Sequence, residues 1–189
     1  MPSRLPVAVV LAAGASSRMG EPKALLRFDG ATLLEHHIGT MRAQGLPVRV
    51  ATGAHAERIE DVAAAAGATV HRNRRWLQTG PMHSLRICVA DLPDATPLLV
   101  TPVDVPPAPA AVIAALLACE GPAVPSVGGQ DGHPIRTTVG VVRKSGRGRT
   151  LRDTLHDADR ISLGWRGALR NLNTPADFRA WRADVAASS

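Results

Sequence analysis

Short apolar runs alternate along the chain with longer amphipathic stretches. The runs are rich in Val, Leu and Ala and contain few polar residues, which is typical of strands covered by helices on both faces. Four such runs are Val7–Leu11, Val48–Thr52, Ala68–His71 and Pro97–Thr101. They predict the central strands of a sheet.

Between these runs, apolar residues recur at the three- and four-residue spacing of a helix with one buried face. The first of these stretches begins with Thr32 and Glu35, the pattern of a capping box that satisfies backbone amides in the first helical turn. The predicted buried faces consist of Leu34, Ile38 and Met41; Ile59, Val62, Ala63 and Ala66; Met82, Leu85, Val89 and Leu92; and Val112, Ala115, Leu116 and Cys119. Strands that alternate with helices imply right-handed crossovers and a mainly parallel sheet, hence an α/β fold.

Beyond Gly128 the alternation is looser. We expect a strand at Thr137–Val142, a basic loop, a strand at Ala168–Leu172, and a closing helix from Thr174. The predicted buried face of this helix consists of Phe178, Trp181 and Val185. No linker or internal repeat divides the chain, so we predict a single domain over residues 1–189.

The composition excludes several classes of protein. With 45% hydrophobic and 20% charged residues, the 189-residue chain is neither disordered nor fibrous. A chain of this length buries about 70% of its unfolded surface and needs no disulfides for stability. Cys88 and Cys119 lie in apolar segments without metal-ligand spacing, which favours free thiols and a cytoplasmic location.

The net charge of +6 suggests a nucleic-acid partner at first sight. However, the basic residues are scattered from Arg4 to Arg182, and only 3% of residues are aromatic, which leaves few platforms for stacking bases. We therefore predict a small polyanionic substrate and no nucleic acid. No apolar run approaches the roughly 20 residues that span a membrane. The stretch Leu5–Ala13 after Arg4 imitates a secretory signal, but its β-branched residues favour a first strand.

The first predicted strand continues into a loop of small residues, Leu11–Lys23. Its glycines do not match either of the two common phosphate-binding loops. Small residues nevertheless expose backbone amides, Ser16 and Ser17 add hydroxyl groups, and Arg18 and Lys23 can reach one polyphosphate from opposite ends. The segment is either a phosphate site or a flexible surface turn with two incidental cations.

An acidic residue, Asp104, follows the fourth predicted strand. It therefore lies at the carboxyl edge of the sheet, the edge that also carries the loop after the first strand, and open α/β sheets bind ligands there. Asp104 either holds Mg²⁺, which prefers oxygen ligands, or caps the helix that follows Pro107.

Three segments resemble those of one enzyme family. Leu11–Lys23 resembles the LAAGxSxRMGxxK signature of the MobA-like nucleotidyltransferases, with the molybdenum-cofactor cytidylyltransferases as the nearest branch. Val103–Pro106 resembles the family's PVDxP segment, and Asn171–Asp177 resembles its NxNTPxD segment. Thr174 and Asp177 also form a sound helix cap, so we assign only Asn173 to the metal site.

The resemblance implies a Rossmann-like three-layer sandwich of the nucleotide-diphospho-sugar transferase type. It implies that Asp104 and Asn173 hold Mg²⁺ and that the catalytic residues are Arg18, Lys23 and Asp104. The residues implied to bind the nucleotide are Leu11, Ala12, Ala13, Gly14, Ser16, Ser17, Arg18 and Lys23, together with Gly80 and Ser84 on the side of the base.

The base and acceptor sides rest on weaker patterns. The stretch Asn73–Arg86 resembles the family segment that lies against the base, although a plain helix start with Ser84 facing solvent is the alternative. The pair Ala12–Ala13 resembles the cytidylyltransferases more than the guanylyltransferases, which favours CTP. Gly132, His133 and Pro134 resemble the acceptor-side element, or His133 is an ordinary surface histidine. Ile135–Thr138 departs from the family pattern, which leaves the acceptor open.

We therefore expect an Mg²⁺-dependent nucleotidyltransferase that transfers CMP from CTP to a phosphorylated acceptor such as molybdopterin cofactor and releases pyrophosphate. Within this class, GTP is an alternative donor, and a sugar or alditol phosphate is an alternative acceptor. An oxidoreductase on the same scaffold is a second class, although the chain has no dinucleotide fingerprint. A non-catalytic nucleotide-binding protein is the third.

Overall fold

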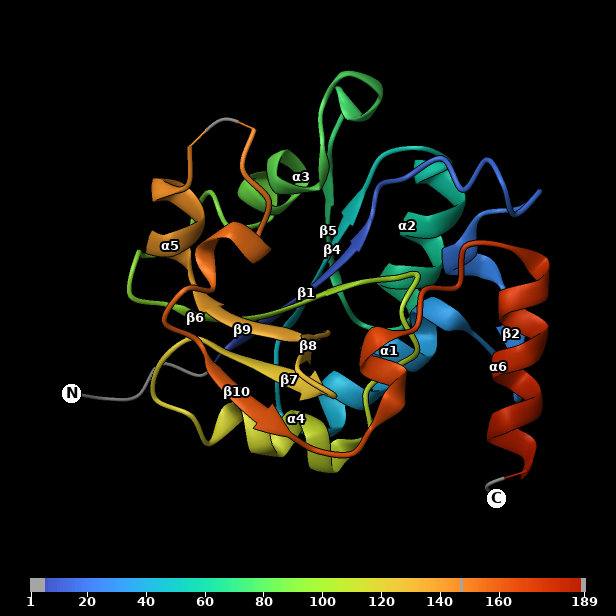
Figure 1. Ribbon diagram of the computed structural model, residues 1–189. Helices are drawn as coiled ribbons and strands as arrows, with labels where there is room; N and C mark the ends of the chain where they lie inside the picture. Colours follow the sequence, from blue (N-terminus) through green and yellow to red (C-terminus); the bar gives the residue numbers. More distant parts are fainter. Residues whose placement is uncertain (1–5, 147, 188–189) are drawn as a thin grey trace.

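The computed structural model describes residues 6–146 and 148–187. Arg4 and Leu5 of the signal-like stretch, and Arg147 of the basic loop, lie outside the described residues. Among the described residues, eight strands form one sheet in the order β10-β7-β9-β6-β1-β4-β5, with β8 paired to β7 (Figure 1). The strands are β1 Val7–Ala12, β4 Val48–Thr52, β5 Thr69–Arg72, β6 Pro97–Pro102, β7 Ala123–Val127, β8 Gln130–Asp131, β9 Ile135–Thr138 and β10 Asp159–Ser162.

The centre of the sheet is parallel. Strand β1 pairs with β4 on one side and with β6 on the other, and β5 follows β4, all in the same direction. Strand β9 is antiparallel to both β6 and β7. The predicted α/β fold with a mainly parallel sheet is confirmed, and the carboxyl ends of β1, β4, β5 and β6 meet at one edge.

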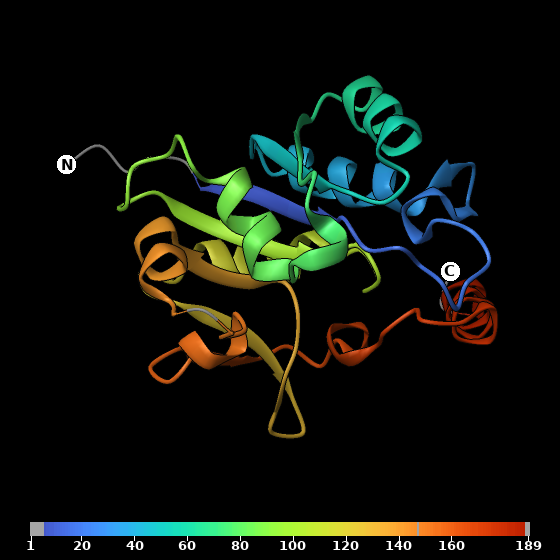
Figure 2. The ribbon, with the colours of Figure 1, turned by 90° about the horizontal axis from the view of Figure 1, so that it is seen from above.

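Helices cover both faces of this sheet, which makes three layers (Figures 1 and 2). Helices α1 (Leu33–Ala43), α2 (Ala56–Ala65) and α4 (Ala110–Leu117) pack on one face. Helices α3 (Pro81–Cys88) and α5 (Val139–Lys144) pack on the other.

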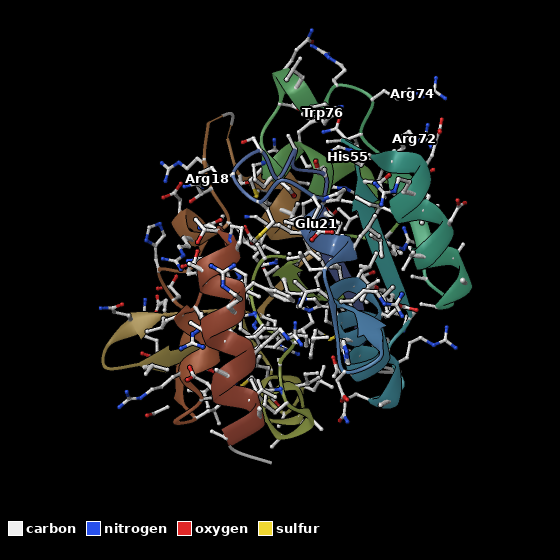
Figure 3. The ribbon with its side chains drawn as sticks, turned by 90° about the vertical axis from the view of Figure 1, so that its right-hand side faces the viewer. Arg18, Glu21, His55, Arg72, Arg74 and Trp76 are labelled. Atoms are coloured by element: carbon white, nitrogen blue, oxygen red, sulfur yellow. The ribbon has the colours of Figure 1, made fainter. Side chains whose placement is uncertain are left out.

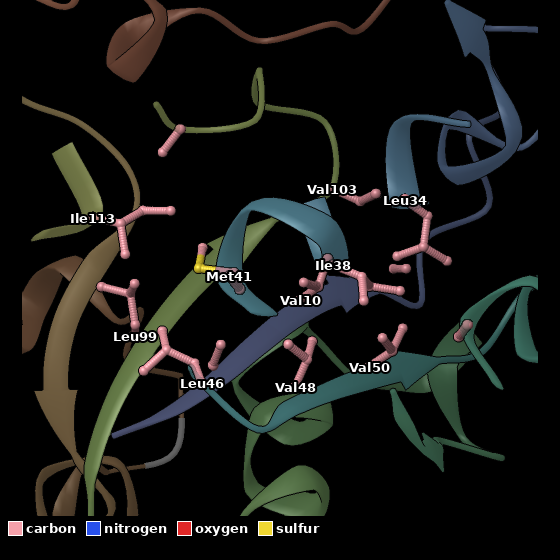
Figure 4. Close-up of a cluster of buried hydrophobic side chains, with 14 of the residues drawn as sticks. Val10, Leu34, Ile38, Met41, Leu46, Val48, Val50, Leu99, Val103 and Ile113 are labelled. Carbon is pink, nitrogen blue, oxygen red and sulfur yellow. The ribbon is translucent and has the colours of Figure 1, made fainter. Parts of the chain in front are cut away.

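Strand β1 shows why its sequence is apolar throughout. Its side chains alternate between the two faces, so that Ala8 and Val10 pack with α1, whereas Val7 and Val9 pack with α3 and α5. Figure 4 shows Val10 beside Ile38 in the first of these two cores. Because both faces are covered, every position of the strand favours an apolar residue.

The last helix lies beside the sandwich rather than within it (Figure 1). Helix α6 (Pro175–Ala187) buries Phe178 and Trp181, as predicted, whereas Val185 is 41% exposed. Trp181 packs edge-on against Phe28 at 4.4 Å between ring centroids. Phe28 belongs to the small hairpin of β2 (Arg27–Phe28) and β3 (Ala31–Thr32), which leads into α1.

Two predicted strands are wrong. Within Thr137–Val142, β9 ends at Thr138, whose hydroxyl accepts from the amide of Val141 and caps α5. The β-branched residues that suggested a strand there are the apolar face of a short helix.

The segment Ala168–Leu172 is not a strand: residues 166–169 form a 3₁₀ helix that lies against β7 and β8. The segment crosses the carboxyl edge of the sheet instead, where the amide of Leu172 donates to the carbonyl of Asp104 at 2.7 Å. Strands β7, β8 and β10 were not predicted.

Other predictions of the sequence are confirmed. The capping box at Thr32 and Glu35 is formed, and both cysteines are free. In the part of the chain that the structure describes, no helix combines the length and apolar character needed to cross a bilayer.

Candidate active site at the carboxyl edge of the sheet

The loop after β1 and the turn after β6 lie side by side, because β1 and β6 are hydrogen-bonded neighbours. The amide of Val103 donates to the carbonyl of Leu11 at 3.0 Å and fastens the turn to the loop. A cavity of about 420 Å³ opens at this place. The predicted site residues that line it are Leu11, Ala12, Ala13, Gly14, Ser16, Lys23, Gly80, Ser84 and Asp104.

A larger cavity, of about 860 Å³, lies between α2 and α6. None of the predicted catalytic, nucleotide-binding, acceptor-binding or metal-binding residues lines it. We assign the site to the smaller cavity, since it contains Lys23, Asp104 and the loop of small residues.

Lys23 is the centre of the polar cluster. Its Nζ donates to Oδ2 of Asp104 at 2.9 Å and to Oδ1 of Asn173 at 2.6 Å. The side chains of Lys23 and Asp104 are 12% and 28% exposed, so this ion pair is only partly screened by water. Three segments that are far apart in the sequence therefore meet at one ammonium group.

The two oxygens that Lys23 contacts fit a hard divalent cation. One carboxylate oxygen and one amide oxygen converge on a single positive group, and such oxygens are the ligands that Mg²⁺ and Mn²⁺ prefer. The described residues contain no group of three or more His, Cys, Asp or Glu side chains that could hold a metal. A cation at this place would thus need further oxygens from phosphate and water.

The alternative role of Asp104, as a helix cap, is wrong. Helix α4 begins at Ala110 and its N-cap residue is Pro109. By contrast, the predicted cap of α6 is formed: Oδ2 of Asp177 accepts from the amide of Thr174 at 2.8 Å, and the amide of Asp177 donates to Thr174 Oγ1 at 3.2 Å. The amide of Asn173 also donates to Asp177 at 3.1 Å, so this cap holds Asn173 in place.

The loop after β1 is closed by Ser16. Its hydroxyl accepts from the amide of Lys23 at 3.0 Å, and its backbone has a φ of 54°, in the left-handed region that non-glycine residues rarely adopt. Ser17 and Arg18 are exposed and do not line the cavity. Figure 3 shows Arg18 on one side of the loop, with Arg72 and Arg74 on the other. Of the two predicted cations, Lys23 reaches the cavity and Arg18 does not.

Ser84 lies on the opposite wall of the cavity and is buried, so the interpretation that it faces solvent is wrong. Its Oγ accepts from Nδ2 of Asn73 at 3.0 Å, which leaves the hydroxyl proton of Ser84 available to a ligand. Asn73 also donates to Thr79 Oγ1 at 2.9 Å. These bonds hold the cavity wall that the base would face.

Gly53 was missed by the sequence analysis, which named Asn73 only as the start of the stretch Asn73–Arg86. Asn73 directly follows β5, and Gly53 directly follows β4, so their positions at the carboxyl ends of strands were the available signal. A Cβ atom on Gly53 would lie 2.7 Å from the carbonyl oxygen of Ala13 and 2.7 Å from Cβ of Trp76. Only glycine allows the loop after β1 to approach so closely.

The predicted acceptor-side element lies near Asp104 but does not line the cavity. The amide of His133 donates to the carbonyl of Ala168 at 3.0 Å, and a Cβ on Gly132 would come within 2.6 Å of Ala168. Burial, together with the charge of Arg152, lowers the pKa of His133 to about 4, although Asp104 opposes the shift. The imidazole of His133 is therefore neutral near pH 7.

Comparisons with known proteins agree with this geometry. The family model of the MobA-like NTP transferase domain matches residues 8–169. A molybdenum cofactor guanylyltransferase of Xanthomonas euvesicatoria pv. vesicatoria is 41% identical over 110 residues, which are 58% of this chain and 52% of that protein. The chain matches about half the length of the curated relatives.

Solved structures share the fold of the chain. A nucleotidyl transferase from Methanothermobacter superposes with a TM-score of 0.81 at 24% identity and covers 98% of this chain and 99% of its own. Rv0371c from Mycobacterium tuberculosis H37Rv, in complex with manganese, has a TM-score of 0.75 at 20% identity and covers 95% of this chain and 98% of its own. These neighbours have the fold of the nucleotide-diphospho-sugar transferases. The family model matches residues 8–169, and the signature loop and the polar cluster around Lys23 agree with that match. The chain therefore belongs to the MobA-like NTP transferase family.

Proposed function

We propose that this chain is a single nucleotidyltransferase domain that transfers GMP from GTP to a phosphorylated acceptor of the molybdopterin type and depends on a divalent metal. The observation that carries the proposal is the contact of Lys23 with both Asp104 and Asn173 beside a cavity lined by the loop after β1. Cation, carboxylate and exposed backbone amides are the groups that a triphosphate needs.

In the proposed reaction, an oxygen of the acceptor's phosphate attacks the α-phosphorus of the nucleotide. One P–O bond forms, the bond between the α-phosphorus and the oxygen bridging to the β-phosphorus breaks, and pyrophosphate leaves with that electron pair. The step needs little covalent help from the protein. Lys23 lies where it can neutralise charge on the departing pyrophosphate, and we propose that Arg18 joins it when the loop closes on the nucleotide.

Asp104 and Asn173 would hold the metal, since their oxygens already converge on one cation. When bound, Mg²⁺ or Mn²⁺ supplies Lewis-acid stabilisation of charge on the phosphate oxygens. With a metal held by Asp104 and Asn173, the ammonium group of Lys23 would be free to contact the polyphosphate. The manganese complex of Rv0371c, a protein of the same fold, supports the use of a divalent ion.

The curated relatives change our expectation of which nucleotide is the donor. The pair Ala12–Ala13 favoured CTP, but the relative that is 41% identical carries the name of a guanylyltransferase. On the base side, the hydroxyl of Ser84 can bond to either base, whereas both amide hydrogens of Asn73 are already donated to Ser84 and Thr79. We therefore propose GTP as the donor and keep CTP as the competing outcome.

The acceptor side is proposed to consist of Gly132, His133 and Pro134. A neutral imidazole at His133 can donate or accept one hydrogen bond without adding charge beside the metal. The nearby Arg152 offers a cation to an anionic acceptor.

The test compares GTP, CTP and ATP, each with Mg²⁺ and with Mn²⁺, by pyrophosphate release in the presence of molybdopterin cofactor. The same nucleotides are compared by thermal stabilisation, which follows RT ln(1 + [L]/Kd). We expect GTP to give both the largest thermal stabilisation and the fastest turnover. Faster turnover with CTP would overturn the nucleotide assignment.

Three further results would overturn the activity itself. Turnover with a sugar or alditol phosphate, but not with molybdopterin, would show that the acceptor is not of the molybdopterin type. Binding of a nucleotide without pyrophosphate release on any acceptor would favour a non-catalytic protein. Oxidation or reduction of a nicotinamide cofactor would favour an oxidoreductase.

A further inference from the structure

The turn that carries Asp104 is held from three directions. The amide of Val103 donates to Leu11 at the end of β1, and the carbonyl of Asp104 accepts from Leu172 in the segment before α6. The third hold is a side chain: Nε2 of His37, in α1, lies 2.9 Å from the carbonyl oxygen of Val105. The first two bonds join backbone groups and do not depend on the identity of any side chain.

His37 is fully buried, with 0% of its surface exposed. It lies in α1 between Leu34 and Met41, which pack in the core on that face of the sheet. A polar group in such a place destabilises the fold unless it is hydrogen-bonded. Packing alone therefore favours an apolar side chain at position 37. A histidine is favoured there if the site requires its hydrogen bond to Val105.

The geometry also fixes the proton on the ring. A carbonyl oxygen only accepts, so Nε2 must carry the hydrogen, and Nδ1 has no hydrogen-bond partner in the protein. By distance and angle the ring of His37 makes one hydrogen bond, to the residue after Asp104, and the backbone of Val103, the residue before Asp104, also interacts with the ring. Neither Lys23 nor Asn173 contacts the backbone of this turn through a side chain.

We propose that His37 is a positioning residue that fixes the Asp104 carboxylate beside Lys23 and Asn173 and thereby sets the affinity of the metal site. The inference rests on the proposed metal-binding role of Asp104. It predicts that loss of the Nε2–H donor weakens divalent-ion binding more than loss of an equivalent bond elsewhere on α1. Partners of this kind, one shell away from the metal, typically change affinity or activity 10- to 100-fold.

The neighbouring residue provides a matched control. His36 lies in the same helix, and its Nε2 lies 3.0 Å from the carbonyl oxygen of Phe28 in β2. Its ring also stacks on that of Phe28, with 3.9 Å between centroids. Loss of His36 therefore removes a histidine-to-carbonyl bond of the same kind, but from the hairpin rather than from the Asp104 turn.

The experiment compares His37→Leu and His37→Met, which remove the donor, with His37→Gln, whose Nε2 can replace it, and with the control His36→Leu. Mn²⁺ affinity is measured by electron paramagnetic resonance, with unfolding by urea and, where turnover is found, kcat and the metal concentration for half-maximal activity. We expect the apolar variants at position 37 to bind Mn²⁺ about tenfold or more weakly. His37→Gln should recover most of this affinity, and His36→Leu should lose stability while keeping wild-type Mn²⁺ binding.

Two results would overturn the proposal: wild-type Mn²⁺ affinity in the apolar variants at position 37, or an equal loss of affinity in His36→Leu at equal loss of stability. If His37→Leu and His37→Met do not fold, the test uses His37→Gln. Mn²⁺ affinity and kcat equal to those of the wild type then support the proposal. Mn²⁺ affinity as low as that of the metal-site variant Asn173→Ala refutes it. A wild-type protein that binds Mn²⁺ but turns over no nucleotide counts against the proposed function alone, because the Mn²⁺ comparison still decides the role of His37.

Discussion

Lys23 contacts two oxygens from residues that lie 81 and 150 positions away in the sequence. Such a contact forms only when the β1 loop, the turn after β6 and the segment before α6 have all reached their final places. The low exposure of the Lys23 side chain means that its charge acts through a medium less polar than water. At the scale of single residues, the site is therefore an electrostatic cluster that can be tested one side chain at a time.

Replacing Lys23 by Ala should lower kcat about 10²- to 10³-fold, because one preorganised contact to a developing oxyanion is worth that much. The chain offers a matched control, since Lys144 is its only other lysine and is exposed at the end of α5. Lys144→Ala should turn over at the wild-type rate. Pyrophosphate release under saturating nucleotide measures both, and a Lys23→Ala enzyme with full turnover would refute the assigned role.

Replacing Asn173 by Asp should lower the metal concentration needed for half-maximal activity, since ligand charge raises the affinity of an oxygen site for a divalent ion. Asn173→Ala should raise the same concentration, because it leaves Asp104 as the sole side-chain ligand among the residues assigned to the metal. Titration of activity with Mg²⁺ and with Mn²⁺ gives both values. If the two variants respond alike, Asn173 does not contact the metal.

At the scale of elements, helix α6 positions Asn173, which contacts Lys23 together with Asp104. Its capping pair, Thr174 and Asp177, also binds the amide of Asn173, and the hydrogen bonds from Thr174 lower the pKa of Asp177. The rings of Phe178 and Trp181 then fix the helix against the hairpin before α1. A surface helix thus determines where one proposed metal ligand lies.

Asp177→Ala should raise the metal requirement and lower the midpoint of thermal unfolding, because the start of α6 and the backbone of Asn173 lose their acceptor. The control is Asp153→Ala, which removes the two bonds that the Asp153 carboxylate accepts from the amide and the hydroxyl of Thr150 beside a short 3₁₀ helix. That variant should change stability without changing the metal requirement. Equal metal titrations for the two variants would show that the cap of α6 does not order the site.

At the scale of the whole molecule, ion pairs on separate elements neutralise part of the positive charge. Arginines pair with carboxylates from several separate elements: Arg49 with Asp91, Arg72 with Glu60, Arg143 with Asp94, Arg160 with Asp131, and Arg170 with Asp184. At least one partner of each pair is exposed, so each pair contributes little to stability.

The stability of the molecule should fall as the pH drops from about 6.5 to about 4. Burial lowers the pKa of His37 from 6.5 to about 4, although Asp104 opposes the shift. The unfolded chain therefore binds the proton first, and the folded state loses up to about 3 kcal/mol across this window. His133 acts in the same direction.

Urea unfolding at about pH 7 and about pH 5 measures this difference. His37→Gln should reduce the loss on acidification. The depressed pKa values of carboxylates such as Asp177 affect stability at lower pH, below the ordinary range of a carboxyl group, so the two effects separate. A His37→Gln protein with the full wild-type pH dependence would contradict the assignment.

The sequence by itself determined the features that depend on near neighbours in the chain. The apolar run of β1, the helical spacing in α1 and the capping pairs at Thr32 and Thr174 are local, and each was predicted. The parallel direction of the central strands follows from the helices between them, so the edge that holds Lys23 and Asp104 could also be inferred. The signature Leu11–Lys23 identified the family for the same reason, because one continuous loop carries it.

Tertiary structure decided what depends on distant partners. Whether Thr137–Val142 continues as a strand depends on the element that packs against it. Residues 139–144 form helix α5 instead, because the apolar face of that helix packs against α3. The burial of Ser84 under Asn73, and of His37 beneath the Asp104 turn, comes from contacts 11 and 68 residues apart. Local preference is set by a residue and its neighbours in sequence, whereas burial and hydrogen-bond partners are set by the packing of the whole fold.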